Sequence, residues 1–360
     1  MKKILSVILS VMMLGSIAAF FAGCGGEAGV GSAGEVNVYN WGEYISKDGL
    51  YGLMDVIEEF EKETKIKVNY TTYETNEDLY NMLKNSNVSY DVIVPSDYMI
   101  EKLIRENMLL ELNYDNIPNY ANLSERFRNL SCDPESKYTV CYDWGVTAIV
   151  YDKTKVKSTP KDWNALWDKS LKGDILMFNN SRDAMAIAMQ LCGIDPSNCT
   201  KEDIDKAAAK LREQKPLLKK YVMDQVFTEM ETGQSAIASY YAGDIAMMME
   251  ENEDLDYCLP ADGSNLFYDA MCIPTCSKNK ENAEAFINFM QKPEIAAENC
   301  RYLRYGSPNK AAIELLEDEI KNSELTFPSD EYLDKCYVFS NLDQDVYEYM
   351  QEQFVRIQAD

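Results

Sequence analysis

The segment VNVYNWGEYIS, residues 36–46, contains the feature that decides the fold, because a strand ends there in aromatic and acidic residues. Apolar and polar residues alternate at its start, as in a strand with one buried face. Trp41, Glu43 and Tyr44 then follow together on a predicted turn. Ligands of open α/β sheets bind beyond the carboxyl ends of the strands, so this turn is predicted to lie at a binding edge.

Strand and helix patterns alternate along the chain after this segment. Apolar residues at 53, 56, 57 and 60 fall at helical spacing, and KIKVNYTTY (65–73) alternates like a strand. Thr75 and Asp78 form an approximate capping box before the next helix. YDVIVPSDY (90–98) has the continuous apolar centre of a buried parallel strand. This order predicts an α/β layer with a mainly parallel sheet.

Four further segments resemble the first one in composition. We expect each to place polar or aromatic groups just after an apolar strand. They are PSDY (95–98), NNSRD (179–183), YYAGD (240–244) and LFYD (266–269). Together with residues 41–44, they predict a single binding edge built from five strand ends.

Composition excludes several classes of function. The chain has 360 residues, enough for two domains, and a formal net charge of −25. A nucleic-acid partner is not expected, because a polyanion requires a basic surface. The absence of histidine removes Ser-His and Cys-His catalytic pairs and HExxH metal sites. Paired-carboxylate glycosidase chemistry survives this exclusion, and an acidic protein also suits a cationic ligand.

The N-terminus is predicted to be a targeting segment. Two lysines precede a long apolar run, and FAGCGG places small residues before Cys24. The pattern resembles a bacterial lipoprotein signal at 1–23, with Cys24 as the lipidated residue and 24–35 as a flexible tether. A plain transmembrane anchor is the alternative. Lipidation places the protein outside the cytoplasm, attached to a membrane that it does not enter.

The other nine cysteines leave their redox state open. Cys132 and Cys141, and likewise Cys192 and Cys199, are close enough in sequence to be bridged. An anaerobic host would instead leave them as buried thiols. No zinc-like arrangement of cysteines is present, so we expect neither a metal nor a cofactor.

Aromatic residues and acids at one edge suit a particular kind of ligand. Aromatic faces attract cations and cover methylene groups, while carboxylates make charge-assisted hydrogen bonds to ammonium groups. A linear polyamine has both an apolar centre and cationic ends. Sugar sites also combine rings with acids, so composition alone leaves a carbohydrate ligand open.

Several blocks of sequence carry a family resemblance. They are VYNWGEYIS (38–46), ETNEDLYNML (74–83), YDVIVPSDYMIEKL (90–103), WGVTAIVYD (144–152), FYDAMCIPTCSKNKENAEAFINFM (267–290) and RYGSPNKAA (304–312). In these blocks the chain resembles the bacterial spermidine/putrescine-binding proteins, the extracytoplasmic receptors of polyamine ABC importers. The resemblance runs from about residue 36 to the C-terminus.

The resemblance implies a type II periplasmic-binding fold, with two α/β lobes joined by crossing strands. We expect residues 36–146 and 270–306 in lobe 1, and residues 147–269 and 307–360 in lobe 2. The ligand would lie between the lobes, and the closed form would be recognised by ABC permease subunits. The resemblance implies no enzymatic activity, and we expect a monomer.

The resemblance also assigns roles to individual residues. Trp41 and Tyr44 would line an aromatic box, with Glu43 beside an amine. Further ligand-binding positions implied by the matching blocks are Ser96, Tyr98, Asp183, Asp269 and Tyr305. Asp269 matches the acid most central to holding an amine, and it stands next to an apolar strand, where an unpaired charge is expensive.

Other positions depart from the family pattern. Asn180 stands where spermidine-selective members carry an aspartate, and Asp244 matches an acid of the putrescine-binding branch. Tyr241 and Phe267 stand where many members have tryptophan, and Ser340 matches a polar residue of the last segment only loosely. Loss of the carboxylate at 180, with one kept at 244, favours the shorter diamine as a hypothesis.

Three functions therefore compete at the level of sequence. The first is a receptor for putrescine, spermidine or both. The second is a receptor for another small solute, such as a sugar, on the same fold. The third is a secreted glycosidase with paired carboxylates. We rank them in this order.

Overall fold

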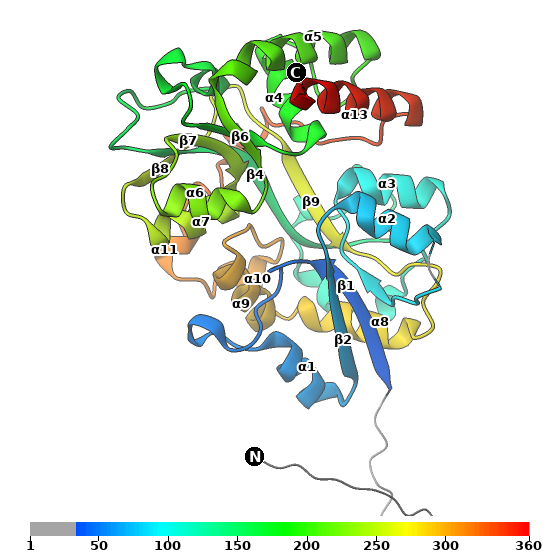
Figure 1. Cartoon of the computed structure of the whole chain (residues 1–360). Helices are drawn as coiled ribbons and strands as arrows, with labels where there is room; N and C mark the ends of the chain where they lie inside the picture. Colours follow the sequence, from blue (N-terminus) through cyan, green and yellow to red (C-terminus); the bar gives the residue numbers. More distant parts are fainter. Residues whose placement is uncertain (1–33, 86, 360) are drawn as a thin grey trace, which may run out of the picture. The chain divides into compact units, whose positions relative to one another are not determined.

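The computed structural model describes residues 34–85 and 87–359, and Figure 1 shows their arrangement. The predicted signal and Cys24 lie outside these residues. The strands are β1 (Glu35–Trp41), β2 (Lys67–Tyr73), β3 (Val92–Ile93), β4 (Val140–Asp152), β5 (Ile175–Phe178), β6 (Leu218–Val222), β7 (Ile237–Tyr241), β8 (Leu255–Cys258) and β9 (Leu266–Met271).

The helices cover both sheets formed by these strands. They are α1 (Val56–Thr64), α2 (Asn76–Asn85), α3 (Asp97–Arg105), α4 (Ser181–Leu191), α5 (Lys201–Gln214), α6 (Gln225–Glu231), α7 (Ala242–Glu251), α8 (Lys280–Met290), α9 (Pro293–Leu303), α10 (Lys310–Ile313), α11 (Asp318–Lys321), α12 (Asp330–Leu333) and α13 (Gln344–Ala359). Short 3-10 helices span Leu50–Gly52, Tyr114–Asn116, Pro118–Asn122, Glu125–Phe127, Trp163–Trp167, Lys169–Leu171 and Lys215–Leu217.

The first sheet confirms the predicted parallel layer. Its strand order is β2-β1-β3, and β1 is parallel to both neighbours. Helices α1 and α2 pack on β2, and α8 packs on β1. At the start of α2 the Thr75 hydroxyl accepts a hydrogen bond from the Asp78 N–H at 3.0 Å, which is one half of the predicted capping box. The same hydroxyl donates to Asp78 Oδ2 at 2.7 Å.

The second sheet is only partly parallel, which corrects the expectation of a mainly parallel arrangement. Its order is β6-β5-β7-β4-β8, with β9 paired to β4. Strand β5 runs parallel to β6 and β7, but β4 runs antiparallel to β7, β8 and β9. Apolar runs alone predict a buried strand, and they do not fix the direction in which it runs.

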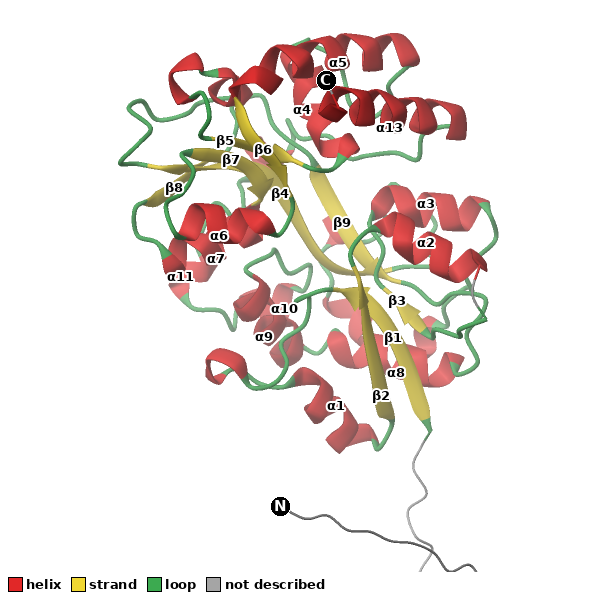
Figure 2. Ribbon diagram, in the orientation of Figure 1, coloured by secondary structure: helices red, strands yellow, loops and turns green. Residues whose placement is uncertain are grey.

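Strands β4 and β9 connect the two sheets, as Figure 2 shows. Residues 147–152 of β4 pair within the second sheet, whereas residues 140–146 pair with β9. Beyond this pairing, β9 reaches the first sheet, where Ile93 and Cys272 exchange backbone hydrogen bonds of 3.0 and 2.8 Å. These are the crossing strands that the type II periplasmic-binding fold implies, and solved structures described below share the fold.

Two hydrophobic cores stabilise the described chain. The larger spans both sheets and their helices, and the smaller joins α9 to α10 and the start of α11. C-terminal helix α13 packs on α4 and α5. The division into two lobes with boundaries at 146/147, 269/270 and 306/307 stays a prediction.

The cysteines from Cys132 to Cys336 are all free thiols in this structure. Most are buried, which favours the interpretation of apolar thiols over that of disulfides. Within residues 34–85 and 87–359, no helix combines the length and apolar character needed to cross a bilayer.

Asp91 connects the first strand to the segment that follows β9. Its buried carboxylate accepts hydrogen bonds from the backbone and side chain of Asn37, both at 2.9 Å. It also accepts bonds from Ser277 Oγ and from the N–H groups of Lys278 and Asn279, at 2.8 to 3.0 Å. Burial alone raises the pKa of Asp91, but these donors together hold that pKa below its usual value.

We predict that Asp91→Ala lowers the free energy of unfolding by roughly 3 kcal/mol, because several buried donors lose a charged acceptor. The contribution of Asp91 is complete above the unfolded pKa, near 4, and is lost as pH falls through the lower folded pKa. Guanidinium chloride unfolding at pH 7 and pH 3 measures both effects. Asp115→Asn, at an exposed carboxylate, is the control, and equal midpoints for Asp91→Ala and wild type would contradict the prediction.

Candidate functional site

Four aromatic rings lie in a row where β4 and β9 cross between the sheets. Tyr44 and Tyr305 have centroids 5.8 Å apart, Tyr305 and Phe267 are 5.8 Å apart, and Phe267 and Tyr241 are 5.7 Å apart. All three pairs are close to edge-to-face, a favourable arrangement for aromatic pairs. We call these rings, together with Asp183, Asp244 and Asp269, the acid–aromatic cluster.

Asp269 is bonded at only one side of its carboxylate. The Tyr44 hydroxyl donates to Oδ2 at 2.8 Å, whereas the buried Oδ1 has no hydrogen-bond partner. Burial raises the pKa of Asp269 to about 6, while the neighbouring Ser96 and the hydrogen bond from Tyr44 lower it. The Oδ1 atom of Asp269 therefore lacks a hydrogen-bond donor, and a cationic ligand would supply one.

Asp183 has the same arrangement at the other end of the row. The Tyr241 hydroxyl donates to its Oδ2 at 2.9 Å, and its Oδ1 is buried without a partner. Burial raises the pKa of Asp183 to about 6, opposed by the Tyr241 hydrogen bond and by the charge of Arg182. Asp183 forms no ion pair with its neighbour Arg182 among the described residues.

Asp244 completes the set of acids beside the rings. Burial raises the pKa of Asp244 to about 7, while a hydrogen bond with Tyr305 lowers it. Tyr44, Tyr305 and Tyr241 thus each contact one carboxylate of the cluster. Among residues 34–85 and 87–359, no lysine or arginine forms an ion pair with any of the three acids. A cation brought among them would therefore relieve the cost of burying their charge.

The local sequence explains how β9 contributes two members of the cluster. Side chains two residues apart in a strand project to the same face, so Phe267 and Asp269 lie together. This corrects one expectation, because LFYD (266–269) is the start of β9 and does not follow a strand. The segments at 179–183 and 240–244 do lie where β5 and β7 end, as predicted.

Two glycines make room for Tyr305. A Cβ at Gly145 would lie 2.8 Å from the Phe267 ring and 2.9 Å from the Tyr305 ring. A Cβ at Gly243 would lie 2.8 Å from the Tyr305 ring. Such approaches are closer than van der Waals contact, so any larger residue at either position would displace the rings.

Trp41 and Glu43 make their hydrogen bonds to groups outside the acid–aromatic cluster. The Trp41 indole N–H donates to the Val94 carbonyl at 2.8 Å, and its ring packs on Tyr73. Glu43 is exposed, with its backbone at a φ of 48°, and accepts a hydrogen bond from the Tyr302 hydroxyl at 2.8 Å. Their predicted roles beside a ligand amine are untested and stay predictions.

A cation of the chain itself occupies the part of the predicted site around Tyr98 and Ser340. The guanidinium of Arg182 lies 4.0 Å from the Tyr98 ring centroid, 5.4 Å from that of Tyr347 and 5.6 Å from that of Phe339. It also donates to the Ser340 carbonyl at 3.1 Å. Sequence reasoning missed Arg182, since an arginine between two polar residues carries no signal of burial; only 6% of it is exposed.

Asn180 serves as the N-cap of α4. Its Oδ1 accepts hydrogen bonds from the N–H groups of Arg182 at 2.9 Å and Asp183 at 3.4 Å. Asparagine is among the best N-capping residues, so this position has a structural role whatever the ligand is. The cap also fixes the direction in which α4 presents Asp183.

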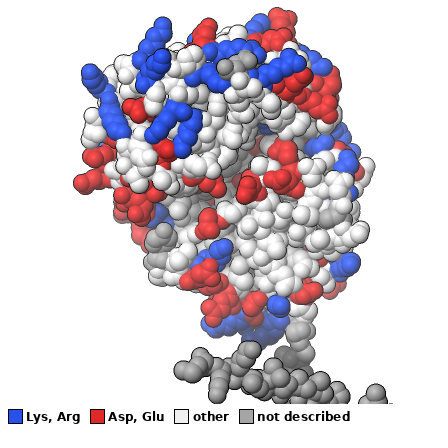
Figure 3. All heavy atoms as spheres, in the orientation of Figure 1, with Lys and Arg blue, Asp and Glu red and all other residues white. Residues whose placement is uncertain are grey.

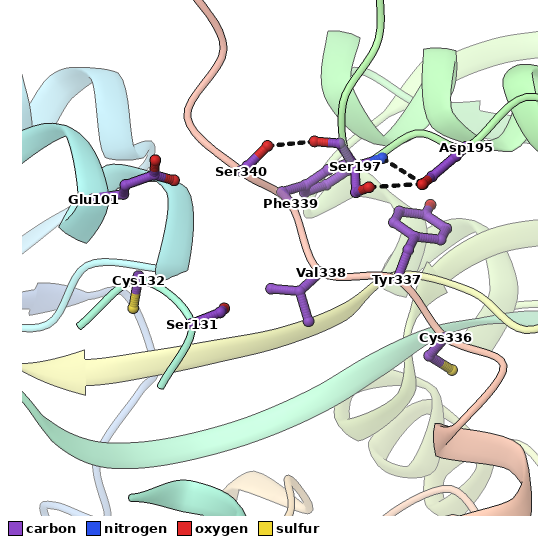
Figure 4. Close-up of a pocket in the computed structure, with 10 residues that line it drawn as sticks. All are labelled: Glu101, Ser131, Cys132, Asp195, Ser197, Cys336, Tyr337, Val338, Phe339 and Ser340. Atoms are coloured by element: carbon purple, nitrogen blue, oxygen red, sulfur yellow. Dashed lines mark hydrogen bonds between the residues drawn. The ribbon is translucent and has the colours of Figure 1, made fainter. Parts of the chain in front are cut away.

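An open cavity of about 520 Å³ lies beside this region, as Figure 4 shows. Its lining comes from Glu101, Ser131, Cys132, Asp195, Ser197 and the segment from Cys336 to Ser340. Of the predicted ligand residues, Ser340 alone lines it, and the Ser340 hydroxyl donates to the Ser197 carbonyl. The acids of the cluster are not in this cavity, and their chemistry makes the cluster the better candidate.

The surface charge agrees with a cationic ligand. Figure 3 shows acidic side chains around the hollowed middle of one face. The basic side chains visible on this face gather mainly toward the end where Figure 1 places α5 and α13. An acidic surface raises the local concentration of cations and speeds their encounter with the protein.

Known proteins resemble the chain over most of its length. Residues 55–328 match the family described as bacterial extracellular solute-binding protein. The spermidine/putrescine-binding periplasmic protein of Salmonella typhimurium is 30% identical over 299 residues, covering 82% of this chain and 84% of that protein. The putrescine-binding periplasmic protein SpuD of Pseudomonas aeruginosa is 29% identical, covering 95% of both chains.

Solved structures give the same result for the fold. A putative spermidine/putrescine ABC transporter structure from Listeria monocytogenes is 37% identical with a TM-score of 0.84, covering 90% of this chain and 98% of that one. The substrate-binding protein PotD from Streptococcus pneumoniae is 33% identical with a TM-score of 0.80, covering 91% and 99%. These relatives are binding proteins, so the glycosidase alternative is wrong.

We predict that Gly145→Ala lowers the free energy of unfolding by about 1–3 kcal/mol, because Phe267 and Tyr305 must move to admit a methyl group. Thermal unfolding followed by circular dichroism measures the change. Gly42→Ala is the matched control, since a Cβ at Gly42 meets no atom within 4 Å. Equal melting temperatures for the two variants would show that the rings do not need the space at Gly145.

Proposed function

We propose that this chain, which belongs to the family of bacterial extracellular solute-binding proteins, is an extracytoplasmic receptor for linear polyamines. In this role it delivers putrescine, spermidine or both to an ABC transporter and catalyses no reaction. The observation that carries the proposal is the row of four rings flanked by half-bonded carboxylates. The names of the relatives described above support the same ligand class.

The chemistry of the cluster fits a polyamine better than a sugar. An alkyl chain packs on aromatic faces, and each ammonium group brings up to three N–H donors and a positive charge. Asp269 and Asp183 each have an oxygen that lacks a donor. A neutral sugar would supply donors, but it would leave two or three desolvated charges uncompensated.

Within this ligand class we propose a preference for the shorter diamine, putrescine. Asn180 carries no charge, and its Oδ1 already accepts the hydrogen bonds that cap α4. Asp244 supplies a carboxylate beside Tyr305. The guanidinium of Arg182 already stands against Tyr98. A third ammonium directed toward that ring would meet a like charge, which disfavours spermidine.

The attachment of the protein to the cell surface belongs to the proposal as well. Cys24, preceded by an apolar run and followed by a glycine-rich tether, is the proposed site of lipidation. A lipid there would hold a monomer near the ABC permease subunits. The proposed lobes, residues 36–146 with 270–306 and residues 147–269 with 307–360, would close on the ligand.

Titration calorimetry of the purified mature chain with putrescine, spermidine and maltose tests the proposal. We expect heat with both polyamines, tighter binding of putrescine, and none with maltose. Affinity should weaken as the pH falls through 7 and 6, because Asp244, Asp183 and Asp269 must lose their protons to bind a cation. Binding of maltose alone would establish the sugar receptor in its place.

Asp269→Asn is predicted to weaken putrescine binding by about 2–5 kcal/mol, since a buried ammonium loses its charged partner. Calorimetry at pH 7.5 measures this loss. Asp195→Asn is a control, because Asp195 lies at the separate cavity and bonds to Ser197. An affinity equal to that of wild type would remove Asp269 from the site.

Asn180→Asp is predicted to improve spermidine relative to putrescine, because it adds a carboxylate near the end of the row. Aspartate caps helices as well as asparagine does, so the melting temperature should change little. The ratio of the two dissociation constants is the measurement. An unchanged ratio would show that residue 180 acts only as the cap of α4.

A further inference from the structure

A second acid stands directly opposite Asp269 on the neighbouring strand. In the antiparallel pairing of β4 with β9, Asp143 is the partner of Asp269, and Gly145 is the partner of Phe267. Residues opposite each other in such a pair project to the same face, with Cβ atoms about 4.5–5.5 Å apart. Asp143 therefore lies on the face of the strands that carries the acid–aromatic cluster.

Asp143 is buried and incompletely bonded. Only 2% of it is exposed, and its Oδ2 has no hydrogen-bond partner. Along the described chain, no lysine or arginine forms an ion pair with it. The titratable groups that face Asp143 come from four parts of the chain. They are Asp269 on β9, Tyr44 after β1, Cys300 on α9, and Tyr142 and Cys141 on β4 itself.

The fold gains nothing from a carboxylate at this position. Like charges directly opposite each other destabilise a pair of strands, and burial adds a further cost. Every residue of β4 from Val140 to Asp152 is buried, so an apolar side chain would suit position 143 better. The other acid of this strand, Asp152, differs because its carboxylate accepts hydrogen bonds from the N–H and hydroxyl of Thr154.

We propose that Asp143 is a ligand-binding residue, and that Asp143 and Asp269 together hold one ammonium group of the ligand between them. The inference rests on the proposed function and adds to it a residue that the family resemblance did not indicate. An ammonium has three N–H donors, and the unpartnered oxygens, Asp269 Oδ1 and Asp143 Oδ2, offer it two charged acceptors.

The pairing of the two acids also sets how binding depends on pH. Burial, and after it the charge of Asp269, raises the pKa of Asp143 well above its usual range. Without a cation, two buried carboxylates that face each other favour sharing a proton. When the ammonium binds, that proton leaves to the buffer, so binding is coupled to proton release.

Asp143→Asn tests the inference in the full mature chain, with putrescine as the probe. Its affinity should fall about 10- to 100-fold, because one charged acceptor is lost. Calorimetry near pH 6.5 in buffers of different ionisation enthalpy counts the protons released, and the count should be lower than for wild type. Asp152→Asn, on the same strand but outside the cluster, should match wild type in both measurements.

The melting temperature without ligand separates a binding role from a structural one. If Asp143 serves the ligand, Asp143→Asn should leave this temperature unchanged or raise it, since the amide adds no charge opposite Asp269. A lower melting temperature, or unchanged affinity and proton release, would overturn the inference while the polyamine function stands. If wild type binds no amine, the proposed function fails and this inference with it.

Discussion

The structure depends on buried carboxylates that are bonded on one side only. Asp269 and Asp183 each accept a tyrosine hydroxyl at Oδ2, while the other oxygen lies buried without a donor. Such a group is expensive to bury, and the pKa values of both are raised to about 6 as a result. A cation placed beside these two carboxylates would compensate their buried charge. Their burial therefore destabilises the ligand-free protein, and the proposed ligand removes this destabilisation.

The crossing strands are what make this arrangement possible. Strand β9 pairs with β4 along its length, and Cys272, directly after it, bridges to Ile93 of β3. Asp269 therefore lies close to both sheets. Period-two alternation then places Phe267 beside Asp269, and Gly145 on β4 leaves the space in which Phe267 meets Tyr305. Strand β9 thus supplies Phe267 and Asp269, and loops supply Tyr44 and Tyr305. The other members of the cluster come from β7, α4 and α7, and they are Tyr241, Asp183 and Asp244.

The sequence predicted the fold class and several residues of the site. The features that it did not predict depend on contacts between distant parts of the chain. Alternating strand and helix patterns predicted the α/β class. Rings with acids suited a linear polyamine but left a sugar open, and the family resemblance favoured the polyamine. The direction of β4 was not readable, because a buried strand shows the same apolar run in a parallel or an antiparallel sheet. Asp143 was missed because its partner on β9 is distant in sequence. The capping role of Asn180 competes with a binding role in any single sequence, since both use its side-chain oxygen.

Arg182 forms a contact between α4 and α3 that is present without a ligand. It lies in the first turn of α4, which packs on β5 of the second sheet. Its guanidinium packs on Tyr98 of α3, a helix that contacts β9. A cation–π contact of this kind contributes about 0.5–2 kcal/mol, whereas each desolvated, half-bonded carboxylate opposes burial by a comparable amount or more. In the proposed closure of the two lobes, several acids oppose one such contact, so closure without a cation is disfavoured. Because a ligand shifts an equilibrium only by its differential affinity for the two states, a cation that satisfies these acids in the closed form alone can reverse this balance.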